Sequence, residues 1–315
     1  MAREKEPRVQ VLICCRNNSK IISDCLDAIK KQDYKNLFCV VVDDNSNDNT
    51  GELVKKQYKW VKYIYLEKWS GPSLARNIGI DSFSSDYIVI IDSDVILRKD
   101  WIKVMVDFME KNPNVAITGG KTLLGWNHSL IDSVGGKLPP YLIGQDRGRE
   151  ESAKLYNKDK KVIFVGSSDI IVRRSVINKI GKFDAEHGYG SEDLDICWRA
   201  NIAGYDVMYY HKAIAIHNVG TTQKTFGNYR SLFFNRRGWL LAVFKNLETK
   251  SILKYLPIML FVPLHDFIFK LRFNIKELLR PYIAVYKLRD HIREERKRIS
   301  GLRKRSDKEL ISLFR

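Results

Sequence analysis

Two aspartates stand one residue apart at the end of an apolar run. Asp92 and Asp94 follow the β-forming residues 88–91, with Ser93 between them. An apolar run of this length is typical of a strand covered on both faces, as in a parallel α/β sheet. Ligands bind at the carboxyl edge of such a sheet, where paired carboxylates favour Mg²⁺ or Mn²⁺ together with a diphosphate. The structural alternative is that one aspartate caps a helix and the other faces solvent.

Two further polar groups also stand at the ends of predicted elements. Asp43 and Asp44 follow the apolar run 37–42 and could accept hydrogen bonds from a ribose or a base, or form a turn and cap a helix. Arg76 comes after a Gly-Pro turn, where its guanidinium would suit a diphosphate or simply face solvent. The chain has no Gly-x-Gly-x-x-Gly and no Gly-Lys-Ser/Thr motif, which disfavours dinucleotide-binding and P-loop proteins.

A glycine-rich acidic segment, residues 183–195, leads into a predicted helix over residues 194–203. Asp193 could take a proton from an incoming hydroxyl group there. Alternatively, Glu192 and Asp193 are helix-start carboxylates that the helix dipole favours. His217 ends a short apolar run, and a lone histidine of this kind is more often structural than a metal ligand. As a ligand it would need a hydrogen-bonding partner to orient its ring.

Length and composition describe a globular chain of 315 residues, with 44% hydrophobic and 29% charged residues. The net charge is +17, and residues 270–315 contain 15 Lys and Arg against six Asp and Glu. This basic end suggests an anionic partner such as a membrane surface, a nucleic acid or a phosphorylated lipid. Five cysteines without a Cys-x-x-Cys pattern favour reduced thiols, and no signal peptide is visible, so we expect a cytoplasmic location.

The first half alternates predicted strands and helices, which indicates a doubly wound, mostly parallel α/β sheet. The strands are expected at residues 9–15, 37–42, 61–66 and 88–91, and the helices at 19–32, 48–58, 76–82 and 101–111. The alternation loosens from residue 115, and the Gly- and Pro-rich residues 119–148 are expected to form loops or an irregular antiparallel extension. A strand pair is predicted at 162–172, and two short strands at 207–210 and 213–216.

The C-terminal part has a different character. Residues 251–269 are strongly apolar but are interrupted by Lys254, two prolines, His265 and Asp266. A spanning helix needs roughly 20 mostly apolar residues. We therefore expect a helix lying in the membrane interface, followed by basic helices on anionic head groups. An ordinary packing helix with a solvated basic tail is the alternative.

Taken in order, these segments resemble family 2 inverting glycosyltransferases with the GT-A fold, over roughly residues 8–245. The matching motifs are Val-Leu-Ile-Cys-Cys-Arg-Asn at 11–17, Asp-Asp-Asn-Ser at 43–46, Ala-Arg-Asn-Ile-Gly at 75–79, Asp-Ser-Asp at 92–94 and Ser-Glu-Asp-Leu-Asp at 191–195. The segments at 181–184, 192–199 and 215–217 are most similar to the rhamnosyl- and galactofuranosyltransferase branch. Many members have Thr or Ser and Tyr where this chain has Cys-Cys-Arg-Asn, and residues 236–239 lack the Gln of the processive synthases' Gln-x-x-Arg-Trp motif.

The resemblance implies a single displacement on a nucleoside diphosphate sugar by a hydroxyl of a lipid-linked or cell-surface glycan. Asp193 would be the general base, and Asp94, His217 and Asp92 would bind Mn²⁺ or Mg²⁺. The implied donor-binding residues are Cys14, Arg16, Asp43, Asp44, Arg76, Asp92 and Ser93. The implied acceptor-binding residues are Tyr189, Glu192 and Trp198.

The expected organisation is a GT-A catalytic domain over residues 1–225, followed by a basic amphipathic helical region over residues 226–315. Residues 1–115 would form the nucleotide-sugar half of the catalytic domain and residues 116–225 the acceptor half. We expect a peripheral protein on the anionic inner face of the cell membrane, without a nucleic-acid partner. The alternatives are an inactive basic protein that binds membrane or nucleic acid, and a sugar nucleotidyltransferase, which also uses Asp-x-Asp and a metal.

Overall fold

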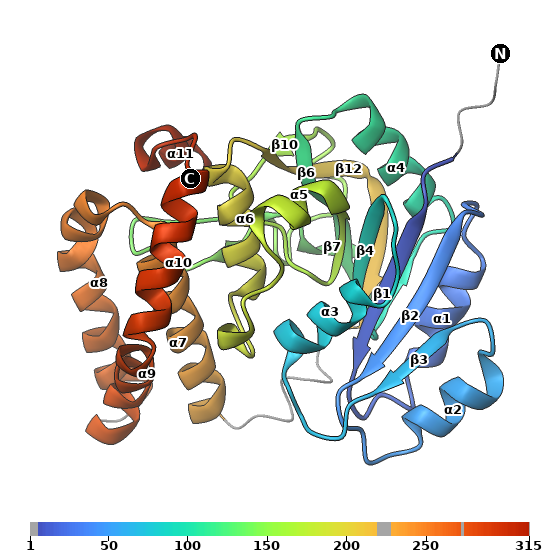
Figure 1. Cartoon of the computed structure of the whole chain (residues 1–315), viewed down its shortest axis with the longest axis horizontal. Coiled ribbons are helices and arrows are strands. Elements are labelled where there is room, and N and C mark those ends of the chain that lie inside the picture. Colours follow the sequence, from blue (N-terminus) through green and yellow to red (C-terminus); the bar gives the residue numbers. More distant parts are fainter. Residues whose placement is uncertain (1–5, 219–227, 272–273, 315) are drawn as a thin grey trace.

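The apolar runs of the N-terminal half form adjacent parallel strands within one mixed sheet (Figure 1). The structure is a computed structural model that describes residues 6–218, 228–271 and 274–314. The parallel strands are β1 (Val9–Cys15), β2 (Leu37–Asp43), β3 (Lys62–Tyr65) and β4 (Tyr87–Asp92). In the register of this sheet, Cys15 lies opposite Asp43, and Cys14 lies opposite Asp92. The residues at the ends of β1, β2 and β4 therefore share one edge.

The second half of the sheet is mixed, with the overall order β10-β12-β6-β11-β4-β1-β2-β3. Its strands are β5 (Val95–Leu97), β6 (Val115–Leu124), β7 (Asn127–Ser133), β10 (Lys160–Lys161), β11 (Asp169–Arg173) and β12 (Asp206–His217). Strand β11 is antiparallel to both β4 and β6, and β12 is parallel to β6. Strand β12 therefore runs in the direction of β4, and its last residue, His217, reaches the edge where Asp92 ends β4. A separate pair joins β8 (Gly136–Lys137) and β9 (Gln145–Asp146).

Helices cover both faces of the sheet, because successive residues of a strand point to opposite faces. Val11 and Ile13 pack in one cluster with α1 (Ile22–Lys30), α2 (Thr50–Gln57) and α4 (Trp101–Lys111). Leu12 packs in the other cluster with α3 (Pro72–Asp81), α5 (Arg174–Ile180) and α6 (Glu192–Ile202). A short 3₁₀ helix, η1 (Ala185–His187), precedes α6. The predicted mostly parallel, doubly wound fold is confirmed.

Several predicted boundaries differ from the structure. Helix α3 begins at Pro72 rather than at residue 76, because proline suits the first position of a helix. Helix α1 is shorter than residues 19–32. The strand pair predicted at 162–172 is the single strand β11, and Phe164 before it makes only an isolated bridge to Gly136. The two strands predicted before His217 are one strand, β12, which contains an irregularity between Tyr209 and Ile214.

The C-terminal helices lie beyond α6, away from β2 and β3 (Figure 1). They are α7 (Asn228–Asn246), α8 (Thr249–Phe269), α9 (Ile275–Lys287), α10 (Arg289–Leu302) and α11 (Asp307–Phe314). Trp239, Leu240 and Val243 of α7 are buried in the cluster that also contains α6. Helix α7 therefore packs on the same hydrophobic core as α6. The predicted division into two regions stays a prediction. The predicted boundary at residues 225 and 226 lies outside the described residues.

Helix α8 continues through Pro257 and Pro263. Its apolar window has a mean hydropathy of 1.6 and is 17% buried, so α8 is long and apolar enough to cross a membrane. By length and composition alone, α8 therefore passes as a possible membrane-spanning helix, despite its two prolines and its polar residues. Its most exposed large apolar side chains are Leu253, Leu260, Phe261, Leu264 and Phe269.

Candidate active site

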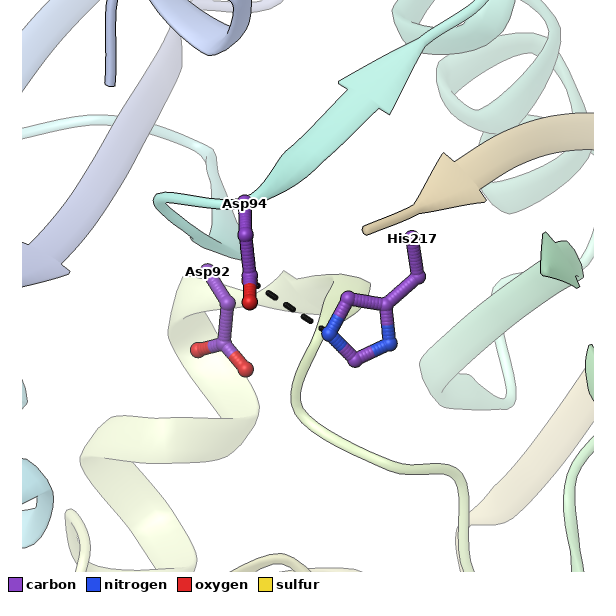
Figure 2. Close-up of side chains that lie close together, drawn as sticks. All are labelled: Asp92, Asp94 and His217. Carbon is purple, nitrogen blue, oxygen red and sulfur yellow. Dashed lines mark ion pairs between the residues drawn. The ribbon is translucent and has the colours of Figure 1, made fainter. Parts of the chain in front are cut away.

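Two carboxylates and an imidazole converge at the edge where β4 and β12 end. Asp92 is the last residue of β4, Asp94 stands in the turn before β5, and His217 ends β12. One ligand atom from each residue lies within 4.8 Å of the others, and Figure 2 shows the side chains facing one another. Nε2 of His217 lies 3.4 Å from a carboxylate oxygen of Asp94. Two oxygens and one nitrogen at this spacing fit a divalent cation such as Mn²⁺ or Mg²⁺.

The imidazole of His217 is held from its other side by Asp132, a residue of β7. Nδ1 of His217 lies 2.8 Å from a carboxylate oxygen of Asp132. Burial lowers the pKa of His217, but hydrogen bonds to Asp132 and Asp94 outweigh burial and raise this pKa to about 10. Arg149 pairs with the second oxygen of Asp132. Asp132 therefore supplies the orienting partner that a ligating histidine needs. Sequence reasoning missed it, because β7 carries no recognisable motif.

Arg76 lies between two carboxylates rather than in open space. One Nη atom is 2.7 Å from Glu192, and the other is 3.3 Å from Asp92. Burial alone would lower the pKa of Arg76. The charges of Glu192 and Asp92 outweigh burial and raise this pKa above its usual value, so the guanidinium stays charged. Because its charge is already compensated, Arg76 holds Asp92 and Glu192 in place in this structure. The predicted contacts of Arg76 with a diphosphate and of Glu192 with an acceptor stay predictions.

Asp193 occupies the first turn of α6, next to Glu192. Its Oδ1 accepts the Leu194 amide at 2.7 Å. Its Oδ2 faces Gly166: a Cβ added to this glycine would lie 3.9 Å from the carboxylate oxygen. Burial, with the neighbouring charge of Glu192, raises the pKa of Asp193 to about 7. A carboxylate with this pKa is suited to accept a proton near neutral pH. Arg76 binds Asp92 and also Glu192, the residue next to Asp193, so it links the start of α6 to the carboxylate pair.

At the end of β2 the two aspartates differ in exposure. Asp43 has no exposed surface, and it accepts hydrogen bonds from the Tyr63 hydroxyl at 2.6 Å and the Ser46 amide at 2.8 Å. The prediction that Asp43 contacts the donor is therefore corrected, because the protein itself covers this carboxylate. Asp44 keeps a little exposed surface and accepts the amides of Ser70 and Gly71, which fixes the loop before α3.

The other predicted donor residues lie along the same edge. Cys14 is half-buried opposite Asp92, and burial raises the pKa of its thiol to about 12, so the thiol is neutral. The Arg16 guanidinium lies 5.8 Å from the centre of the Trp69 ring. Ser93 is buried between the two aspartates. The donor contacts of these residues stay predictions.

The two predicted aromatic acceptor residues have different environments. The Tyr189 ring meets the ring of Phe234 on α7 edge-on, with 5.9 Å between centroids. Trp198 is fully buried in the core cluster, so the prediction that it stacks on an acceptor sugar is wrong. The spacing already indicated this, because a side chain five positions beyond Asp193 points about 140° away from it on an α-helix.

The chain is similar in sequence to known glycosyltransferases. The family model described as "Glycosyl transferase family 2" matches residues 10–181. A poly-beta-1,6-N-acetyl-D-glucosamine synthase of Staphylococcus epidermidis is 23% identical over 209 residues, which are 65% of this chain and 48% of that protein. Glycosyltransferase GlyG of Streptococcus pneumoniae is 30% identical over 148 residues, which are 46% of this chain and 47% of that protein. The chain thus spans about half the length of the curated relatives it matches.

Solved structures share the fold at low sequence identity. GalNAc-T7 with UDP, GalNAc and Mn²⁺ has a TM-score of 0.64 at 14% identity, over 79% of this chain and 49% of that chain. TarS 1–349 of S. aureus has a TM-score of 0.59 at 18% identity, over 94% and 88% of the two chains. Mannosyltransferase PcManGT from Pyrobaculum calidifontis, in complex with GDP-Man and Mn²⁺, has a TM-score of 0.58 at 15% identity, over 95% and 85%. At these identities the likeness shows the common GT-A architecture.

Proposed function

This chain belongs to glycosyl transferase family 2, and from that premise we propose that it is a metal-dependent inverting glycosyltransferase. It transfers a sugar from a nucleoside diphosphate sugar to a hydroxyl group of a lipid-linked or cell-surface glycan. The observation that carries this proposal is the convergence of Asp92, Asp94 and His217 at the carboxyl ends of β4 and β12. These three residues would hold Mn²⁺ or Mg²⁺, which when bound offsets the negative charge of the donor diphosphate.

The remaining residues of the site act on the acceptor and on one another. Asp193 accepts the proton of the attacking hydroxyl, and its pKa of about 7 leaves a substantial ionised fraction at neutral pH. The new bond forms at the anomeric carbon while its bond to the diphosphate oxygen breaks. A single displacement of this kind inverts the anomeric configuration. Arg76 keeps the Asp92 carboxylate in its place at the metal site.

The choice of sugar is a finer proposal. The motifs at 181–184, 192–199 and 215–217 favour a rhamnosyl- or galactofuranosyltransferase, and the interval between Asp193 and His217 is similar to the spacing in that branch. Structures with the same fold are described with UDP and with GDP-Man, so a nucleoside diphosphate sugar is the donor class we propose.

We also propose that the protein is peripheral on the cytoplasmic face of the cell membrane. The exposed apolar side chains of α8 and α9 support this, together with the excess of basic residues over 270–315. The division into a catalytic domain over 1–225 and a membrane-associating region over 226–315 belongs to this proposal.

A panel of UDP-, GDP- and dTDP-linked sugars tests the function. Thermal stability would be measured with and without Mn²⁺, since a ligand stabilises the protein that binds it. We expect one donor to stabilise the protein only when Mn²⁺ is present, and Asp94→Asn to abolish that effect. The anomeric configuration of the transferred sugar, read by NMR, should be opposite to that of the donor. Retention of configuration, pyrophosphate release from an NTP, or no donor-dependent stabilisation would each contradict the proposal.

A further inference from the structure

The segment that carries the candidate base has an irregular backbone. Between Asp184 and Asp195 the chain passes through η1 and then through Gly188, Gly190 and Ser191, all of which have positive φ. Positive φ is strained for a residue such as Ser191, and it persists only where surrounding contacts enforce it. Asp193 lies two residues after Ser191, so its position depends on the contacts that hold this segment.

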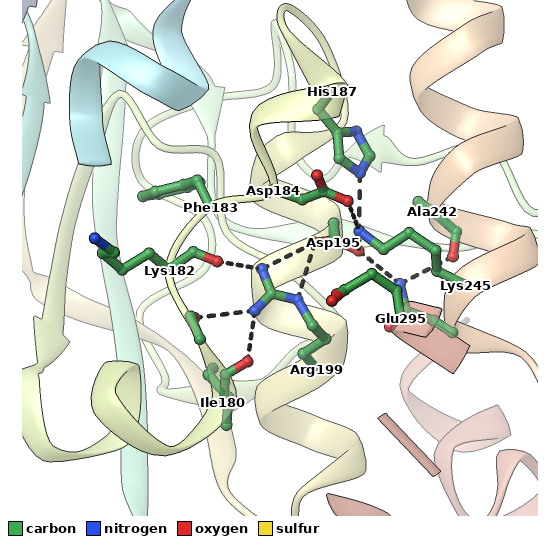
Figure 3. A network of polar contacts seen from close by, with 12 residues as sticks. Ile180, Lys182, Phe183, Asp184, His187, Asp195, Arg199, Ala242, Lys245 and Glu295 are labelled. Carbon is green, nitrogen blue, oxygen red and sulfur yellow. Dashed lines mark hydrogen bonds and ion pairs between the residues drawn. The ribbon is translucent and has the colours of Figure 1, made fainter. Parts of the chain in front are cut away.

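A single buried cation contacts both ends of the segment. Lys245 of α7 is fully buried, and Figure 3 shows its side chain reaching toward η1 and the start of α6. Its Nζ pairs with Asp184, just before η1, and lies 3.0 Å from Asp195, in the first turn of α6. Lys245 thus connects the first and the last residue of the Asp184–Asp195 segment.

The charges around Lys245 are balanced. Asp195 also pairs with Arg199 at 2.9 Å and accepts the side-chain amide of Asn246 at 2.9 Å. Nε2 of His291 on α10 lies 2.9 Å from Asp184. Burial raises the pKa of Asp184, but Lys245 outweighs it and the pKa falls to about 2. Arg199 and Lys245 likewise lower the pKa of Asp195 despite its burial. Both carboxylates are therefore ionised at neutral pH, and each faces a buried cation.

The backbone of α7 also touches this segment directly. A Cβ added to Gly238 would lie 2.2 Å from the carbonyl oxygen of Gly190 and 3.3 Å from Cβ of Ser191. Any side chain at position 238 would push on the residues just before Glu192 and Asp193. Gly301 of α10 offers a matched comparison, because a Cβ there would meet nothing within 4 Å.

We propose that Lys245 is a positioning residue that fixes the Asp184–Asp195 segment and with it Asp193. The consequence for turnover rests on the proposed function, whereas the consequence for the backbone does not. A buried ion pair of this kind could instead serve only the stability of the fold. The two roles differ in what happens when the charges are removed together.

The test compares the wild-type chain with Lys245→Met and with Asp184→Asn/Lys245→Met. It also compares Gly238→Ala with its matched control, Gly301→Ala. Lys245→Met alone leaves a buried carboxylate uncompensated and could unfold the chain. The double variant removes one charge of each sign, leaves Asp195 paired with Arg199, and should keep a melting temperature close to that of the wild type. In that variant we expect amide hydrogen exchange over residues 185–194 to accelerate by at least ~10-fold, with exchange in α1 unchanged. Unchanged exchange over 185–194 in a folded double variant would overturn the proposal.

Turnover of the donor found in the panel gives the second readout. In the double variant we expect kcat to fall on the order of 10²-fold, because a base displaced by about 1 Å loses its alignment. The donor KM should change less than kcat, because Asp94 and His217 belong to other elements and Asp92 is linked to this segment only indirectly, through Arg76 and Glu192. Gly238→Ala should lower kcat in the same way, and Gly301→Ala should not.

Two outcomes would contradict different proposals. If the wild-type chain turns over its donor and the double variant has the same kcat, the role of Lys245 is refuted. A wild-type chain that turns over no donor refutes the proposed function instead, and hydrogen exchange then decides on Lys245.

Discussion

Asp132 and His217 form a hydrogen-bonded pair, with 2.8 Å between a carboxylate oxygen of Asp132 and Nδ1 of the imidazole. The pair joins β7 to the end of β12. Because Nδ1 is bound to Asp132, the other ring nitrogen, Nε2, faces Asp94 and lies 3.4 Å from its carboxylate. A carboxylate behind a histidine fixes both the ring orientation and the nitrogen that is available to a metal. The pair therefore extends the candidate metal site beyond its three ligands.

We expect Asp132→Ala to weaken Mn²⁺ binding about 10–100-fold, the usual cost of losing such a partner. Titration of free Mn²⁺ by electron paramagnetic resonance would measure the affinity without any donor sugar. Asp107→Ala is the control, because Asp107 pairs with Lys103 on the exposed surface of α4. Equal Mn²⁺ affinity in the wild type and Asp132→Ala would show that Asp132 does not support the metal site.

Metal binding should be linked to proton release. The hydrogen bonds from Asp132 and Asp94 raise the pKa of His217 to about 10, so the metal-free imidazole is protonated at pH 7. A metal ligand must be neutral at the coordinating nitrogen. We therefore expect Mn²⁺ affinity to rise with pH between about 6 and 9. Calorimetry in buffers of different ionisation enthalpy should detect the released proton, and His217→Gln should abolish its release.

The pH dependence of turnover should report Asp193. The pKa of this carboxyl is raised to about 7, so kcat/KM should rise as the pH increases through 7. Asp193→Asn should lower kcat by about 10²-fold or more, the typical contribution of a general base. Because an acid with a raised pKa in the folded state penalises folding at high pH, the same variant should also be more stable than the wild type above pH 7. A variant with full turnover would remove Asp193 from the mechanism.

Glu192 should tune this behaviour. Its charge disfavours ionisation of Asp193, so removing it lets Asp193 lose its proton at a lower pH. We expect Glu192→Gln to move the acidic limb of the pH–rate profile below that of the wild type. Glu52→Gln, at an exposed position of α2, should leave the limb unchanged. A limb that moves to higher pH in Glu192→Gln would contradict the electrostatic explanation.

The strand-end carboxylates could be predicted because the carboxyl ends of parallel strands meet at one edge. Asp92 and Asp94 follow directly from the apolar run before them, and the position of His217 follows from a second run. Asp132 could not be predicted, because β7 pairs with β6 antiparallel and with register shifts that no sequence pattern encodes. The role of Lys245 was equally hidden, since its two partners meet it only after α7 has packed on α6.

The prediction for Trp198 failed for a different reason. It relied on the residue type, a tryptophan that could stack on a sugar, and neglected its helical spacing from Asp193. Its ring is fully buried in the core, so Trp198→Ala should lower the free energy of unfolding by about 3–5 kcal/mol. Urea denaturation would measure this change. Trp126→Ala should cost less than about 0.5 kcal/mol, because Trp126 is 68% exposed. A small loss of stability in Trp198→Ala together with a raised acceptor KM would restore the acceptor role.

The membrane proposal depends on side chains of α8 that the rest of the protein leaves uncovered. Leu260 and Phe261 are 63% and 64% exposed, so replacing them removes little internal packing. We expect Leu260→Asp/Phe261→Asp to reduce binding to phosphatidylglycerol vesicles by on the order of 10-fold or more, since two apolar side chains no longer enter the interface. Co-sedimentation would measure binding, and the melting temperature should stay near the wild-type value. Trp126→Asp removes an equally exposed aromatic ring from another part of the surface, and it should bind as the wild type does. If both variants lose binding equally, adhesion is not specific to α8; if neither loses it, the basic helices act without this apolar surface.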